Sequence, residues 1–88
     1  MKDGFYEFLI DKGYKEYTPS GNPSTAYSYY NAIDTVCGNE KLSRSQLSAR
    51  IDEILPKYDQ GGIYEDIGNL SNKTVINALK QFAEFSKN

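Results

Sequence analysis

The chain contains no histidine and only one cysteine, so its carboxylates, lysines and tyrosines are the side chains available for chemistry. The adjacent carboxylates Asp52-Glu53 and Glu65-Asp66 are not ready-made general acid/base pairs, because neighbours on a helix diverge by about 100°. One cysteine without histidine excludes a zinc site within the chain. The sequence also lacks the alternating oxygen ligands of a calcium loop and the glycine pattern of a phosphate-binding loop. We therefore expect no enzymatic activity, no metal and no cofactor.

Three lysines recur at every seventh position near the end of the chain, at Lys73, Lys80 and Lys87. This spacing places side chains in a slowly drifting line along one side of a helix. Such a line of ammonium groups can bind phosphate, although lysines on an outer helix face are more often simply hydrated. The whole chain has a net charge of −2, whereas residues 69–88 carry three lysines against one glutamate, a net charge of +2. Any attraction to phosphate must therefore come from this last segment.

The segment that positions these lysines reads as an amphipathic helix over residues 71–86. Ser71 is predicted as its N-cap, and Leu70 and Val75 have the spacing of a hydrophobic staple. Asn77 and Gln81 share the polar half of the helix with the lysines. The apolar half is expected to face the core and consists of Val75, Ile76, Ala78, Leu79, Phe82, Ala83 and Phe85.

We expect one all-α domain, a compact bundle of four to five short helices. Its predicted elements are helices near 3–12, 23–37, 44–55 and 71–86, with an irregular or short-helix segment at 56–70. A chain of 88 residues has room for one core only. Ile63 and Ile67 are expected to anchor the 56–70 segment to that core. A cytoplasmic location is expected, because the lone Cys37 cannot form an internal disulfide and neither a leader nor a membrane-spanning apolar run is visible.

Several residues predict where the helices begin and end. Pro23 suits the first position of the second helix, where its missing N–H costs nothing, and Gly38 is the expected stop signal. Ser43 and Gln46 have the spacing of a capping box at the start of the third helix. Pro56 is expected to end that helix or to start a new turn.

Three sequence runs resemble the N-terminal core-binding (SAM-like) domain of tyrosine recombinases and phage integrases. An aromatic cluster, FYEFL, is followed by a Gly-Tyr loop, and PSTAYSYY is similar to the family's second helix, which begins after a Thr and carries a Tyr one turn later. The last helix, from SNKT to LKQF, has the family's Ser/Thr start and Leu-(Lys/Arg)-x-Phe close. The runs NPSTAY and VINALKQF are also similar to short uncharacterised proteins of Gram-positive anaerobes and their mobile elements. These are largely core and capping positions, so they indicate a fold better than an activity.

The resemblance implies that the second and last helices meet adjacent major grooves of double-stranded DNA, whereas the family's catalytic residues belong to a separate C-terminal domain. The candidate DNA contacts are the outward positions of the two matched helices: Ser24, Thr25, Ser28 and Asn31 on the second, and Lys73, Asn77, Lys80 and Gln81 on the last. The family's second helix normally carries basic residues, and this one carries none. We therefore predict a non-catalytic DNA-binding or recombination-accessory module with weak, salt-sensitive binding.

An alternative is an acidic, Tyr-rich protein-interaction module, such as a phage or mobile-element inhibitor of a host nuclease. The chain has eight tyrosines and no tryptophan, and its first two-thirds are acidic. Tyrosine is enriched at binding hot spots, and carboxylates around it can imitate DNA phosphates. The candidate protein contacts are Tyr14, Tyr17, Tyr27 and Tyr64. The partner is thus either double-stranded DNA or a protein such as a nuclease or a recombinase.

Overall fold

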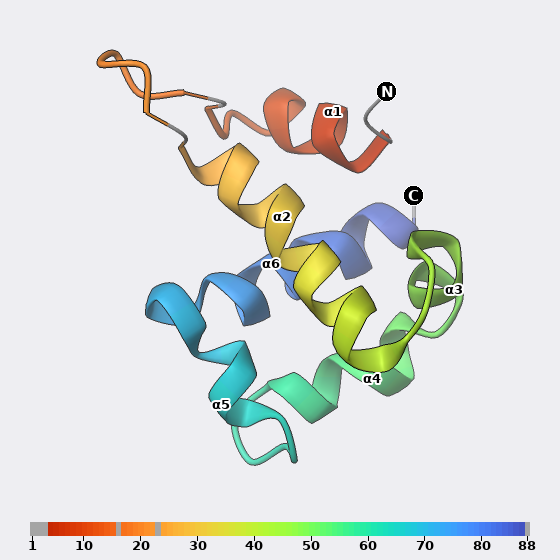
Figure 1. The fold of residues 1–88 in the computed structure, drawn as a ribbon. Helices are drawn as coiled ribbons and strands as arrows, with labels where there is room; N and C mark the ends of the chain where they lie inside the picture. The colour runs from red at the N-terminus through yellow and green to blue at the C-terminus, as the bar shows by residue number, and fades with distance from the viewer. Residues whose placement is uncertain (1–3, 16, 23, 88) are drawn as a thin grey trace.

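The structure is a computed structural model that describes residues 4–15, 17–22 and 24–87, without the side chains of Ser71 and Asn72. In this part of the chain it contains helices and no strand (Figure 1). The six helices are α1 (Gly4–Asp11), α2 (Thr25–Glu40), α3 (Arg44–Ala49), α4 (Ile51–Tyr58), α5 (Glu65–Gly68) and α6 (Leu70–Ser86). The predicted all-α bundle is confirmed, with one helix more than expected. None of these helices combines the length and the apolar character needed to cross a membrane.

Helix α6 is the centre of the bundle, because each of the other five helices packs against it. Its buried side chains are Val75, Ile76, Ala78, Leu79 and Phe82, while Ala83 and Phe85 pack half-buried against the core. This is the face that the helical period of the sequence predicts. Burying one such large apolar side chain contributes roughly 1.5–3 kcal/mol, so this face dominates the stability of the bundle.

Helix α1 is held on α6 by aromatic rings and by one lysine. The fully buried Phe5 meets Phe82 edge to face, with ring centroids 5.0 Å apart. Lys12 Nζ then reaches α6, where it lies 2.6 Å from Glu84 Oε2 and donates a 3.1 Å hydrogen bond to Gln81 Oε1. Gly13 follows α1 with a φ of 100°, a conformation that suits glycine and turns the chain away from the helix.

Helix α2 does not stop at Gly38 as predicted but continues to Glu40. The additional turn is held by Tyr58, whose hydroxyl accepts a 2.6 Å hydrogen bond from Asn39 Nδ2 and donates a 2.8 Å bond to Glu40 Oε2. Lys41 ends the helix in the left-handed conformation, with its N–H bonded to the Cys37 carbonyl. The predicted start at Pro23 lies outside the described residues.

The predicted helix over 44–55 is two helices, because Arg50 leaves the helical conformation between α3 and α4. The capping box at its start is confirmed: Gln46 N donates to Ser43 Oγ at 3.2 Å, and Ser43 N donates to Gln46 Oε1 at 2.9 Å. Pro56 does not end the helix as predicted but lies inside α4. The fully buried Tyr58 anchors the last turn and explains why the helix continues past the proline.

The segment between α4 and α6 folds back as the short helix α5. Tyr64 N donates a 2.7 Å hydrogen bond to the Lys57 carbonyl, which closes the turn. Gly68 packs directly on the Tyr58 backbone, where a Cβ atom would overlap the Tyr58 carbonyl oxygen. Ile67 packs against the core as expected, whereas Ile63 is 78% exposed and does not anchor the segment.

Candidate nucleic-acid interface

Three of the predicted DNA contacts, Lys73, Asn77 and Lys80, line one hollow on the surface of α6. It has a volume of about 350 Å³, and we call it the lysine hollow. The buried Ile76 lines its apolar part. The remaining lining residues come from the chain between the end of α4 and the start of α6 and are Asp59, Gln60, Glu65 and Asn69.

The lysine hollow contains two ammonium groups and two carboxylates that do not neutralise one another. In the described part of the chain, neither Lys73 nor Lys80 comes within the 4.0 Å of a carboxylate that defines an ion pair. The third lysine of the seven-residue repeat differs, because Lys87 Nζ lies 3.1 Å from Asp52 Oδ1. Of the repeat, Lys73 and Lys80 are therefore the lysines whose charge remains available for an anion.

Lys73 also has an unusual backbone, with a φ of 69° inside α6. The left-handed backbone conformation costs a residue other than glycine roughly 1–2 kcal/mol. At Lys73 it interrupts the regular helix after its first turn. The helix itself starts at Leu70, so Ser71 is not its N-cap as predicted. The predicted, slowly drifting line of lysines is accordingly interrupted at its first member, although Lys73 and Lys80 still share one hollow.

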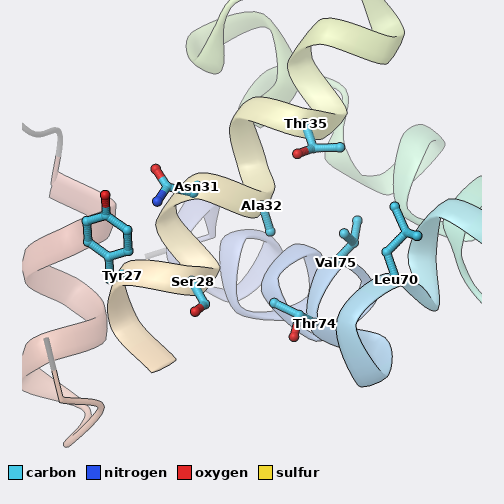
Figure 2. Close-up of a pocket in the computed structure, with 8 residues that line it drawn as sticks. All are labelled: Tyr27, Ser28, Asn31, Ala32, Thr35, Leu70, Thr74 and Val75. Atoms are coloured by element: carbon cyan, nitrogen blue, oxygen red, sulfur yellow. The ribbon is translucent and has the colours of Figure 1, made fainter. Parts of the chain in front are cut away.

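The second predicted helix contributes Ser28 and Asn31 to a separate groove between α2 and α6 (Figure 2). This groove, which we call the α2–α6 groove, has a volume of about 370 Å³. Its lining includes hydroxyl, amide and apolar groups, and the other lining residues are Tyr27, Ala32, Thr35, Leu70, Thr74 and Val75.

Asn77 connects the lysine hollow to α2. Burial raises the pKa of the Tyr29 hydroxyl above its ordinary value, the nearby Tyr14 adds to the rise, and a hydrogen bond with Asn77 offsets part of it. Asn77 thus has a partner on α2 while its residue remains exposed at the hollow. The two predicted helices lie together, and their candidate contacts occupy two neighbouring depressions on either side of the first half of α6.

Three predicted DNA contacts lie in neither depression. Gln81 accepts a hydrogen bond from Lys12 and so belongs to the contact between α1 and α6. Ser24 is the N-cap residue of α2, and Thr25 is the exposed first residue of that helix. Asp59 and Glu65 were not predicted as part of an anion site. No sequence pattern connects these two carboxylates with the lysines, and the turn between α4 and α5 brings them into the same hollow.

The four tyrosines of the alternative prediction fall into two pairs of different character. Tyr14 is half-buried against Tyr29, with ring centroids 5.3 Å apart, and Tyr64 is half-buried against Tyr58 at 5.2 Å. Tyr17 and Tyr27 are exposed, and their ring centroids are 6.4 Å apart. Of the four, this second pair presents more aromatic surface to a partner than Tyr14 and Tyr64 do.

Arg44, the first residue of α3, has a structural role. Its Nη2 donates a 2.7 Å hydrogen bond to the Tyr30 carbonyl and lies 2.9 Å from Asp34 Oδ1, while the guanidinium stacks 4.1 Å from the Tyr30 ring centroid. These contacts tie α3 to α2. Arg44 therefore does not extend the set of cations available to phosphate.

Comparisons of the chain with models of protein families, with curated proteins and with solved structures find no match. The resemblance to the core-binding domain of tyrosine recombinases therefore stays a prediction that rests on the sequence runs alone.

Proposed function

We propose that this chain is a cytoplasmic, non-catalytic DNA-binding or recombination-accessory module that contacts double-stranded DNA weakly through the first half of α6. One observation carries the proposal: Lys73 and Lys80 are exposed, share one hollow with Asn77, and form no ion pair with any described residue. Two ammonium groups beside an amide are suited to neighbouring phosphates of a DNA backbone. The groove on the other side of α6 adds the hydroxyl of Ser28 and the amide of Asn31.

The charges of the lysine hollow predict that this binding is weak. Asp59 and Glu65 lie in the same hollow and repel the phosphates that the lysines attract. If two phosphates are neutralised, the logarithm of the association constant falls with the logarithm of the salt concentration with a slope of about −1.8. The affinity should then drop about 12-fold between 50 and 200 mM salt.

A titration of a fluorescein-labelled 20-base-pair duplex by anisotropy, at salt concentrations from 20 to 200 mM, tests the proposal. The test variant carries Lys73→Glu and Lys80→Glu, and its matched control carries Lys41→Glu and Lys87→Glu. Each pair of substitutions changes the net charge by −4, from −2 to −6, so non-specific repulsion by the whole protein is equal in the two variants.

We expect the test variant to lose duplex binding and the control to lose much less, because Lys41 is outside the hollow and Lys87 is already paired with Asp52. Neutralising the two carboxylates with Asp59→Asn and Glu65→Gln should strengthen binding. Equal losses in the two lysine variants, or no binding of the natural chain at tens of micromolar in 20 mM salt, would exclude this interface.

A protein partner is the second candidate, and the exposed pair of Tyr17 and Tyr27 favours it, since tyrosine is frequent at binding hot spots. Tyr14 and Tyr64 contribute less accessible surface to such a contact, because both pack against core tyrosines. In this case the natural chain would bind neither duplex nor single-stranded DNA, and Tyr17→Ala would weaken an association with a purified nuclease or recombinase.

A further inference from the structure

Tyr17 and Tyr27 come from different elements, and the backbone holds them side by side. Tyr27 lies in the first turn of α2, whereas Tyr17 lies in the loop between α1 and α2, which extends beyond the bundle in Figure 1. Ala26 N donates a 3.0 Å hydrogen bond to the Lys15 carbonyl, and Thr18 N donates a 2.8 Å bond to the Asn22 carbonyl. The first bond attaches the chain just before Tyr17 to the first turn of α2, and the second closes a turn of the loop just after Tyr17.

The geometry of the two rings suits a flat ligand. Their centroids are 6.4 Å apart and their planes are inclined by 35°, while the side chains are 50% and 36% exposed. Two parallel rings that enclose a third flat ring must lie about 7 Å apart, because each of the two stacking contacts has a carbon–carbon distance of about 3.5 Å. A small rotation of the Tyr17 ring therefore opens a space for one planar group, and an unmoved Tyr27 offers one face for stacking.

Polar groups continue from this aromatic pair into the α2–α6 groove. Tyr27 itself lines the groove, and Ser28 and Asn31 follow it along α2 (Figure 2). The groove volume of about 370 Å³ falls in the range of about 300–1,000 Å³ that is usual for small-ligand sites. A ligand stacked on Tyr27 can thus direct hydrogen-bonding groups at its edge towards a hydroxyl and an amide.

A cation is also present at this end of the molecule. The Lys15 carbonyl accepts the hydrogen bond from Ala26 N, so Lys15 lies beside the first turn of α2. Its residue is exposed, and it forms no ion pair with any described residue. Aromatic surface, a polar edge and an ammonium group without an ion pair in the described part of the chain together match a nucleobase that carries a phosphate.

We infer that Tyr17 and Tyr27 form a stacking site for an unpaired nucleobase of single-stranded DNA. The base lies against Tyr27, its edge faces Ser28 and Asn31, and Lys15 neutralises its phosphate. This inference deepens the proposed function by naming unpaired DNA as a second substrate class. It uses residues different from those of the lysine hollow, so each proposal can fail without the other.

Anisotropy of a labelled 12-nucleotide oligodeoxythymidylate at 20 mM salt provides the main test. Loss of one base stack lowers affinity by about 5- to 150-fold, so Tyr27→Ala should raise Kd by that factor. Tyr27→Phe keeps the ring and should stay within about 2-fold of the natural chain. Thermal unfolding of both variants verifies that they are folded, and equal losses in Tyr27→Ala and Tyr27→Phe would overturn the inference.

Two further experiments distinguish a free nucleotide from a DNA strand as the ligand, and the stacking site from the lysine hollow. Addition of thymidine monophosphate should shift the Asn31 side-chain amide signals in the NMR spectrum. If only the oligonucleotide, and not the mononucleotide, causes this shift, the site is still supported and its ligand is a DNA strand. No shift with either ligand at millimolar concentration overturns the inference and leaves the tyrosines for a protein partner. Lys73→Glu with Lys80→Glu should weaken binding of the duplex and leave the dependence of single-strand binding on Tyr27 unchanged.

Discussion

Replacing Gly68 by alanine should destabilise the bundle far more than its single methyl group suggests. Gly68 is the last residue of α5 and lies on the backbone of Tyr58, the last residue of α4. A Cβ atom there would overlap the Tyr58 carbonyl oxygen and lie 3.4 Å from the Tyr58 Cβ. The obstacle is backbone, which cannot rotate away as a side chain can, so α5 must move off α4.

The size of the effect follows from these contacts. Overpacking usually costs about 1–3 kcal/mol, and a backbone obstacle places Gly68→Ala near the upper end, at about 3 kcal/mol. Gly38→Ala is the matched control, because Gly38 lies inside α2 and has no atom within 4 Å of its Cβ position. Glycine in a helix interior is about 1 kcal/mol less favourable than alanine, so this variant should be more stable than the natural chain by about that amount.

Thermal and urea unfolding followed by circular dichroism at 222 nm measure both variants. For a domain of this size, 1 kcal/mol corresponds to about 4–8 °C in Tm. We therefore expect Gly38→Ala to raise Tm by about 4–8 °C and Gly68→Ala to lower it by about 12–24 °C. A Gly68→Ala variant within about 0.5 kcal/mol of the natural chain would refute the packing of α5 on α4, and a destabilised Gly38→Ala would refute the continuation of α2 to Glu40.

Two further predictions concern the buried tyrosine and the unusual lysine. Tyr58→Phe removes the hydroxyl that joins Asn39 to Glu40 and should cost about 1–3 kcal/mol in urea unfolding, because it leaves the half-buried Glu40 carboxylate without this donor. Burial also raises the pKa of the Tyr58 hydroxyl above its ordinary value, so the unfolded chain loses this proton at a lower pH than the folded chain. The contribution of Tyr58 to the free energy of unfolding is therefore complete below about pH 10 and falls by about 1.4 kcal/mol per pH unit above it. The difference in stability between the natural chain and Tyr58→Phe should therefore narrow as the pH rises from 10 to 11, and parallel curves would contradict the raised pKa. Lys73→Gly should lower the free energy of unfolding by less than about 0.5 kcal/mol or raise it, because glycine adopts the left-handed conformation without the steric cost that lysine has. Lys80→Gly, in the regular part of α6, should instead lower the free energy of unfolding by about 1 kcal/mol. Equal losses in these two variants would contradict the positive φ at Lys73.

Local signals predicted the parts of the bundle in which neighbours along the chain decide the structure. The capping box of Ser43 and Gln46 is an example, because both partners lie within one helical turn and need no tertiary contact. Gly38 and Pro56 misled the prediction for the opposite reason, since the buried Tyr58 stabilises turns that local propensity would end.

The candidate sites depend on distant residues and were only partly predictable. The helical period placed Lys73 and Lys80 on one polar face, but it could not show that Lys87 is neutralised by Asp52 of α4. Likewise, Tyr14, Tyr17, Tyr27 and Tyr64 look alike in the sequence. Contacts with Tyr29 and Tyr58 leave Tyr14 and Tyr64 half-buried, whereas Tyr17 and Tyr27 form an exposed pair.

The sequence by itself determined that this chain is helical and which face of α6 is buried, because apolar periodicity acts through the fixed geometry of a helix. Tertiary structure alone decided that Lys87 is ion-paired with Asp52, where α2 ends, and that Asp59 and Glu65 lie in one hollow with Lys73 and Lys80. The physical reason is the distance along the chain over which each interaction acts. Helix formation is settled within a few residues, whereas charge, burial and stacking are settled by whichever residues the fold brings into contact.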